Sequence, residues 1–350
     1  MPTEDYLKGR GAQFNPDNRF QQAHYSQEHD EGLDELPPLP HRQLIREFPQ
    51  TIVSRSNSPD IRHAYSINPY QGCEHGCVYC YARNAHEYWG FSAGLDFESK
   101  IMVKPDAPRL LEQHFQKRGW QAEAIVLSGN TDCYQPVERE LKITRQLLQV
   151  FLKYGNPVGI ITKNALVERD LDILRELAAD QLVHVYFSIN SLDDELRRTM
   201  EPRTASAPKR LAVMEQLSAA GVPCGVMVAP LIPGLNDHEV PQIIRRAADA
   251  GAQAAGYTVV RLNGAVGALF HDWLVKVYPD RAAKVWKQIQ SLHGGQVNDS
   301  TWGRRMSGDG PVAESIRQLF RASRNKYLKG RAMPPYDLTK FRRNGNYWLF

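Results

Sequence analysis

Six short apolar runs, separated by amphipathic segments, constrain the fold of this chain more than any other feature. The runs are rich in β-branched residues and do not alternate with polar ones, which is typical of strands buried on both faces of a parallel sheet. They recur at a spacing of roughly 30 residues, the size of one strand–helix–strand unit. The predicted strands are residues 64–68, 124–129, 158–162, 183–189, 224–230 and 256–260.

The segments between these strands carry apolar residues at helical spacing. They are residues 137–155, 165–180, 207–221 and 237–251, and three of the four end in a glycine that suits a helix C-cap. This alternation predicts an α/β fold with parallel strands and right-handed crossovers. A full eight-unit barrel usually takes about 250 residues. Six units therefore favour a partial, TIM-like (β/α)6 barrel, and a doubly wound sheet is the alternative.

Two flanking regions lack this rhythm. Residues 1–55 are rich in Asp, Glu, Gln, His and Pro, so we expect a partly disordered arm. Most of it should be unstructured, and part of it should order against the body, with a short helix within residues 41–48. Residues 56–265 form the predicted core. Residues 266–350 are predicted to form a helical C-terminal extension with three helices and a basic, aromatic end. We expect this extension to cap the barrel or to hold a substrate or partner.

Bulk composition limits the function classes. The 350 residues carry a net charge of +4, which permits an anionic partner but does not require one. The first residues lack the apolar core of a secretory signal. The most apolar stretch, residues 221–235, contains three prolines and is too short to span a membrane. The five cysteines are unevenly placed, which argues against a disulfide framework and for a reducing cytoplasm.

Three of those cysteines lie in the stretch NPYQGCEHGCVYCYAR, residues 68–83. Cys73, Cys77 and Cys80 have the spacing C-x3-C-x2-C and follow the first predicted strand. Soft thiolates so close together suit zinc or an iron–sulfur cluster. Structural zinc needs four ligands, and the fourth would be His75, Cys133 or Cys224. Three cysteines with one open position favour a 4Fe–4S cluster that keeps one iron free for a small molecule.

With this motif, residues 60–265 resemble the radical S-adenosylmethionine (SAM) enzymes. Later segments, among them SGNTDCYQPVERE and APLIPGLND, are similar to the branch that contains spore photoproduct lyase and DNA repair photolyase-like proteins. The whole chain most resembles an uncharacterised bacterial family within it, the PA0069 family. The resemblance implies that the free iron chelates SAM and that an electron from a flavodoxin or ferredoxin cleaves it. The resulting 5′-deoxyadenosyl radical would abstract hydrogen from an unknown substrate.

The resemblance also implies cofactor contacts. Tyr79 corresponds to an aromatic residue near the adenine, and Gly129, Asn130 and Asp132 correspond to a turn that receives the methionine ammonium. An Asx turn that begins the next helix explains Asp132 equally simply. The apolar residues 232–234 would line the adenine.

Further strand ends supply the remaining contacts. Lys163 would hold the SAM carboxylate, and Ser188 or Asn190 would hold the ribose. Arg203 would pair with that carboxylate or with Glu201. A solvated loop charge is the simple alternative for Lys163.

Two residues are candidates for catalysis by the same resemblance. The lyase has a hydrogen-donating cysteine near the end of the second strand, whereas this chain has Cys133 just after Asp132. That departure counts against a thymine-dimer reaction and leaves Cys133 as a hydrogen donor, a further ligand or a core residue. Tyr81 follows the last cysteine of the motif and would serve a radical relay or simply pack. Cys224 begins a strand and is predicted to lie in the core.

Two other functions stay open. One is repair of a damaged nucleic-acid base, because the basic runs at residues 321–331 and 340–348 mix cations with aromatics. The other is a non-catalytic zinc or iron–sulfur protein that binds nucleic acid. We expect no membrane association and a monomer or weak dimer.

Overall fold

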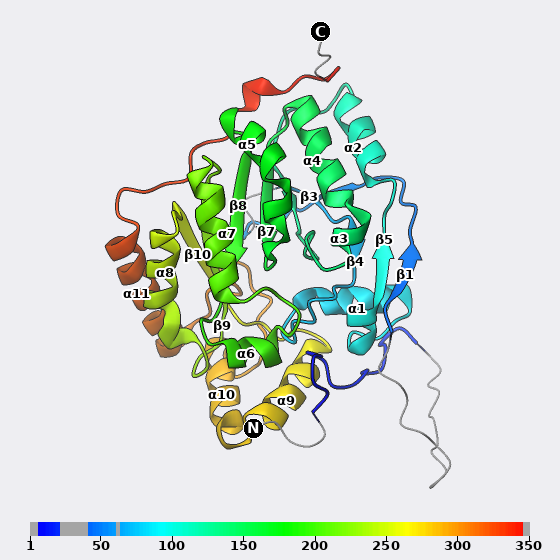
Figure 1. Cartoon of the computed structure of the whole chain (residues 1–350). Coiled ribbons are helices and arrows are strands. Elements are labelled where there is room, and N and C mark those ends of the chain that lie inside the picture. Colours follow the sequence, from blue (N-terminus) through cyan, green and yellow to red (C-terminus); the bar gives the residue numbers. More distant parts are fainter. Residues whose placement is uncertain (1–5, 22–40, 61–63, 346–350) are drawn as a thin grey trace.

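A seven-stranded sheet forms the centre of the molecule (Figure 1). The computed structural model describes residues 6–21, 41–60 and 64–345. Expectations for residues 1–5, 22–40, 61–63 and 346–350 lie outside this range. The strands stand in the order β10 (Ala254–Val259), β9 (Cys224–Leu231), β8 (Val183–Ser188), β7 (Val158–Thr162), β6 (Ile125–Leu127), β3 (Tyr65–Ile67) and β2 (Val53–Arg55).

Six of these strands are the predicted ones, and all six run parallel. Only β2 is antiparallel to its neighbour β3. The order follows the chain without reversal, whereas a doubly wound sheet reverses direction at a switch point. The parallel α/β fold is therefore confirmed. Parallel strands bring their carboxyl ends to one edge, which is where polar side chains of successive strands can meet.

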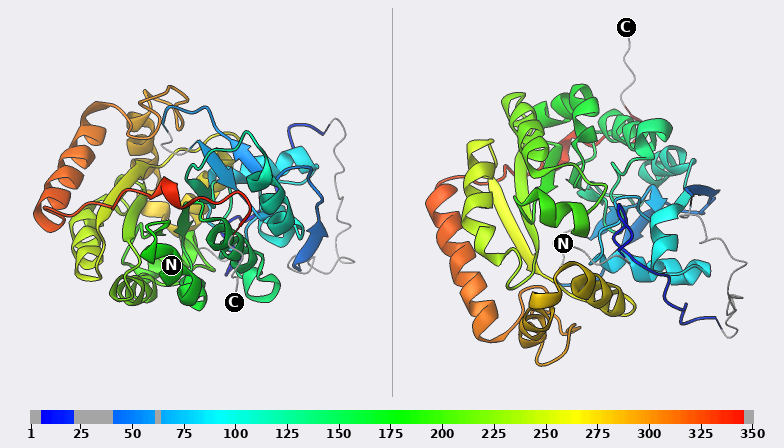
Figure 2. Two further views of the ribbon diagram at one scale, coloured as in Figure 1. Left: turned by 90° about the horizontal axis from the view of Figure 1, so that it is seen from above. Right: turned by 60° about the horizontal axis from the view of Figure 1, so that its bottom comes forward.

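Helices cover the outer face of the sheet (Figures 1 and 2). The layer contains α2 (Ala107–Gln116), α4 (Ile143–Tyr154), α5 (Leu171–Ala179), α7 (Ala207–Ala219) and α8 (Val240–Asp249). The apolar face of α4 is buried, and Gly155 ends it in the left-handed conformation, as the sequence predicts. The predicted helix 137–155 is broken into α3 (Glu138–Leu141) and α4, because Lys142 takes φ 54°. Glu138 accepts a hydrogen bond from the Thr144 amide and so stabilises this break.

A second sheet joins β1 (Gln43–Arg46), β5 (Lys100–Val103) and β4 (Tyr70–Gln71). The expected helix within residues 41–48 is wrong, because β1 is a strand parallel to β5. Its side chains are mostly exposed, so no apolar helical face is available there. Backbone pairing with β5 stabilises the extended form instead. The short helices near this sheet are η1 (Tyr81–Trp89) and α1 (Leu95–Ser99).

Residues 6–21 of the N-terminal arm are packed against the body of the molecule. Ala12 is fully buried, and its amide donates a hydrogen bond to Oε1 of Glu98 at 2.7 Å. Asn18 donates to the carbonyl of Glu87 at 2.8 Å. Gly11 passes so close to Gly76 that a Cβ would lie 1.7 Å from its carbonyl oxygen. The segment therefore covers the outside of the cysteine loop.

The C-terminal extension has the three predicted helices, α9 (Val266–Val277), α10 (Pro279–Leu292) and α11 (Gly310–Tyr327). Residues 328–345, with η4 (Leu338–Lys340), then cross the amino-terminal edge of the sheet (Figure 2, left). Tyr336 stacks on His184 with ring centroids 4.0 Å apart, and its hydroxyl donates to the Val158 carbonyl. The tail thus caps the end of the sheet opposite the strands' carboxyl ends.

No helix in the described part of the chain is long and apolar enough to cross a membrane.

Candidate active site

A cavity of about 540 Å³ opens at the carboxyl ends of the parallel strands. Its walls come from the cysteine loop, from all six parallel strands (β3 and β6 to β10) and the turns that follow them, and from the loop that precedes α11. Among its lining residues are Cys73, Cys77, Tyr79, Cys80, Tyr81, Gly129, Asn130, Asp132, Lys163, Ser188 and Arg261. Most residues singled out in the sequence therefore surround one space, although they come from segments that are far apart in the chain.

The cysteine loop is held by backbone contacts and by a buried arginine. Gly72 and Gly76 take φ 76° and 68°, a conformation that favours glycine. Arg83 is fully buried and donates to the carbonyls of Cys77 at 2.9 Å and Gly76 at 3.0 Å. Its charge is paired with Glu98 at 2.7 Å. Arg83 was not predicted from the sequence, although it ends the quoted motif.

The donor set of this loop fits an iron–sulfur cluster better than zinc. Tetrahedral zinc with Zn–S bonds of about 2.3 Å would need sulfur atoms within roughly 4 Å of each other. Within residues 6–21, 41–60 and 64–345, no three His, Cys, Asp or Glu side chains are close enough to hold one metal ion. His75 is engaged elsewhere, with Nε2 3.1 Å from Asn164 and Nδ1 3.4 Å from Asp132. Three separate thiols facing a common cavity are compatible with a larger, multi-iron group.

The thiols are strongly desolvated. Burial, aided by the nearby Asp132 carboxylate, raises the pKa of Cys73 to about 12. Burial also raises the pKa of Cys77, and Glu201 adds to that effect. These thiols remain protonated at neutral pH unless a metal replaces the proton.

Asp132 mainly organises the turn after β6. Its Oδ1 accepts hydrogen bonds from the amide of Tyr134 at 2.9 Å and the hydroxyl of Thr162 at 2.8 Å. Its Oδ2 accepts from the amide of Lys163 at 2.7 Å. The Asx turn considered from the sequence is thus present, and it also joins the ends of β6 and β7. Asp132 still lines the cavity, but its oxygens already accept three hydrogen bonds.

The backbone before Asp132 is shaped by residues that the sequence did not single out. Ser128 takes φ 82°, a strained conformation for a residue other than glycine, and its hydroxyl accepts from the Cys133 amide. Asn68 accepts from the amides of Asn130 at 2.7 Å and Thr131 at 3.3 Å. Tyr81 donates a hydrogen bond to the Gly129 carbonyl, so it joins this turn to the cysteine loop.

A buried ionic group lies behind Tyr79. The Tyr79 hydroxyl donates to Glu201, and the other oxygen of Glu201 pairs with Arg210 at 2.9 Å. Burial alone would raise the pKa of Glu201, but Arg210 and Lys163 outweigh it and hold that pKa below its usual value. The Nζ atom of Lys163 lies 5.9 Å from the centre of the Tyr79 ring. Burial lowers the pKa of Lys163, whereas Glu201, and Cys77 once it has lost its proton, raise that pKa, and the net shift is upward.

Arg203 and Asn190 lie outside the cavity lining. Arg203 pairs with Glu98 at 3.0 Å rather than with Glu201. Asn190 is buried behind Tyr79, and its amide nitrogen is 3.4 Å from the Tyr79 hydroxyl. Ser188 does line the cavity, and its carbonyl accepts from Arg210. The pairing of Glu201 with Arg210 replaces the Glu201–Arg203 pair considered from the sequence.

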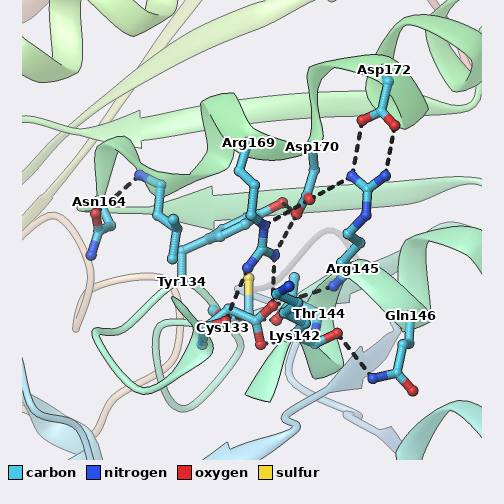
Figure 3. Close-up of polar contacts among 12 residues, drawn as sticks. Cys133, Tyr134, Lys142, Thr144, Arg145, Gln146, Asn164, Arg169, Asp170 and Asp172 are labelled. Atoms are coloured by element: carbon cyan, nitrogen blue, oxygen red, sulfur yellow. Dashed lines mark hydrogen bonds and ion pairs between the residues drawn. The ribbon is translucent and has the colours of Figure 1, made fainter. Parts of the chain in front are cut away.

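Cys133 is fully buried in the main apolar core and does not line the cavity. Its carbonyl accepts from the Thr144 hydroxyl at 2.6 Å. The adjacent Tyr134 donates to Asp170, which also pairs with Arg145 and Arg169 (Figure 3). This network supports the turn from behind. Cys224 is also fully buried in the core, where the sequence placed it.

Known proteins resemble this chain in sequence and in fold. A family model described as the radical SAM superfamily matches residues 67–247. An uncharacterised Mycobacterium tuberculosis protein, Rv2578c, is 34% identical over 230 residues, which cover 65% of this chain and 68% of the relative. A radical SAM Nalpha-GlyT isomerase of Pseudomonas phage M6 is 23% identical over 195 residues, or 55% of this chain and 38% of that protein.

Among solved structures, spore photoproduct lyase complexed with dinucleoside spore photoproduct aligns with a TM-score of 0.62. The alignment covers 85% of this chain and 86% of the lyase at 16% sequence identity. Similarity at this level of identity concerns the fold.

Proposed function

Because the chain belongs to the radical SAM superfamily and is a radical SAM enzyme, we propose that Cys73, Cys77 and Cys80 bind a 4Fe–4S cluster. The adjoining cavity would bind SAM. When bound, the two groups supply a one-electron cleavage of SAM and a radical that abstracts hydrogen from a substrate. The observation that carries the proposal is that three cysteines and the polar ends of β6, β7 and β8 line one cavity. A non-catalytic binding protein is no longer an alternative.

Within the cavity, each group has a role that its contacts support. Lys163 offers a cation, compensated by Glu201, to the SAM carboxylate. The loop from Gly129 to Thr131, held by Asn68, offers acceptors to the SAM ammonium. The buried Tyr79 ring would face the adenine, because its hydroxyl is fixed by Glu201. Ser188 would contact the ribose. The sheet that carries these groups would be a partial (β/α)6 barrel.

A low-potential donor such as a flavodoxin or ferredoxin would supply the electron. All five cysteines are free in the structure. Free thiols and a reduced cluster need a reducing compartment, so we propose a cytoplasmic location.

Anaerobic reconstitution tests this function. The protein is loaded with iron and sulfide, reduced with dithionite and given SAM, and iron content, absorption spectrum and 5′-deoxyadenosine are measured. Cys77→Ala should lose iron and product together. Cys224→Ala is the matched control, since Cys224 is also buried but lies in the core. A colourless zinc protein, or deoxyadenosine from Cys77→Ala at the wild-type rate, would overturn the proposal.

Repair of a nucleic-acid base is a second candidate. The alignment with a lyase solved in complex with a dinucleoside lesion favours it. The basic run 340–348 supports it less, because the described part of that run packs on the capped end of the sheet. Arg343, for example, donates to the carbonyl of Trp120. Binding of lesion-containing DNA that weakens steeply with salt would support repair, and salt-independent binding would contradict it.

A further inference from the structure

Residues 58–60, which follow β2, contact residues 303–305 in the loop before α11, and we call this contact and the adjoining ends of β2 and β10 the seam. Asp60 accepts from the Gly303 amide at 2.8 Å and pairs with Arg305 at 2.5 Å. Arg305 also donates to Ser58 at 2.6 Å and lies over the exposed ring of Trp302. Residues from this seam that line the cavity are Ser56, Arg261 and Met306.

Arg261 differs from Lys163, the other cation that lines the cavity, because no described carboxylate lies close to its charge. It follows β10 and is half-buried. Across residues 6–21, 41–60 and 64–345, its guanidinium forms no hydrogen bond and no ion pair within 4 Å. Burial lowers the pKa of Arg261, and the like charge of Arg305 lowers it further. Tyr81 and Asp60 raise that pKa, but the net shift is downward, and the Asp60 oxygens accept hydrogen bonds from Arg305 and Gly303.

The neighbouring cations are compensated. Lys163 faces Glu201 and the cysteine thiols, and Arg305 is paired with Asp60. A guanidinium taken out of water without a partner costs free energy, and a bound anion would recover it. The planar fork of arginine matches two oxygens of a carboxylate or phosphate.

The cavity around Arg261 can hold such an anion close to the cysteine loop. Tyr81, which follows Cys80, is close enough that Arg261 and Tyr81 shift each other's pKa. The hydroxyl-bearing residues Ser56, Ser66 and Thr258 line the same cavity and could donate further hydrogen bonds.

We propose that Arg261 binds an oxyanion of the substrate, a carboxylate or a phosphate, at the seam side of the cavity. The proposal rests on the proposed function, because it takes the cavity as the place where substrate meets the radical. It makes Arg261 a specificity-determining residue and the substrate an anionic molecule.

Binding of two probe anions, inorganic pyrophosphate and malonate, tests this without turnover. Calorimetry is done on the anaerobically reconstituted full chain with saturating SAM, so that sites for the SAM carboxylate are filled. We expect one probe to bind, and Arg261→Gln to weaken it by about tenfold or more, as for loss of a charge-assisted bidentate contact. The affinity of Arg261→Lys should lie between those of the wild type and Arg261→Gln, because lysine keeps the positive charge but cannot form the bidentate contact of a guanidinium. Arg109→Gln, an exposed arginine paired with Asp106, is the matched control.

Preference for pyrophosphate would identify a phosphate-bearing substrate, and preference for malonate a carboxylate-bearing one. Three results would overturn the proposal: binding of neither probe with or without SAM, equal binding by Arg261→Gln at an unchanged unfolding temperature, or binding of a probe only when SAM is left out. The last would mean that Arg261 holds SAM itself. If the wild-type protein forms no deoxyadenosine in the reconstitution assay, the proposed function is wrong. Binding of the probe anions can still be measured in that case.

Discussion

The hydroxyl of Tyr79 donates a hydrogen bond to Glu201, although the two residues are 122 positions apart in the chain. Glu201 is fully buried and also pairs with Arg210, which is 2% exposed. The cysteine loop is thereby joined to the segment that follows β8 through one carboxylate. The stability of the site depends on such contacts between segments that are distant in the chain.

Removing the Glu201 carboxylate should lower the stability of the protein. Glu201→Ala leaves the Arg210 guanidinium buried without its counterion, so we expect a loss of about 3–5 kcal/mol in the free energy of unfolding. Urea denaturation measures it. Glu314→Ala, which removes an exposed pair with Arg317, should cost less than about 1 kcal/mol. Similar losses in both variants would show that the buried pair is not a special contributor.

His86 should contribute, as should the buried His75, to a loss of stability in mild acid. Its ring packs between Phe91 and Phe97, and burial lowers the pKa of His86 to about 4. The unfolded chain binds this proton below about pH 6.5 and the folded chain does not, so stability is complete above that pH and falls towards pH 4. Between pH 6.5 and pH 5 this group should account for about 1.5 kcal/mol. His86→Phe should remove that part of the slope in denaturation curves, and an unchanged slope would contradict the assignment.

The N-terminal segment should detach when Gly11 gains a side chain. A Cβ there would lie 1.7 Å from the Gly76 carbonyl oxygen, and backbone can yield only by moving the segment or the cysteine loop. We expect Gly11→Ala to lower stability by about 1–3 kcal/mol and to speed tryptic cleavage after Arg10. Gly119→Ala is the control, because nothing lies within 4 Å of the added atom. Equal cleavage rates in the two variants would mean that the contact does not hold the segment.

Cys133 should not take part in the chemistry. Since it lies in the core and away from the cavity, Cys133→Ala should cost about 1–2 kcal/mol of stability through the lost sulfur contacts. Iron content and deoxyadenosine formation should stay as in the wild type. A variant that keeps its stability and its cluster but loses deoxyadenosine would restore Cys133 as a functional residue.

The sequence by itself determined the parallel strands, the helices between them, the three C-terminal helices and the cysteine loop. Each of these depends on residues close together in the chain, through apolar periodicity, glycine placement or motif spacing. The gathering of strand-end polar groups at one edge followed as well, because parallel strands point their carboxyl ends the same way.

Only the tertiary structure decided which polar groups face the cavity and which satisfy each other. Arg203 pairs with Glu98, 105 positions away, and Glu201 pairs with Arg210 instead. Arg261 was not singled out from the sequence, yet it lines the cavity, and no carboxylate of the described residues pairs with it. Side-chain pairing depends on direction and burial at contacts between distant segments, and local sequence patterns carry no signal for either.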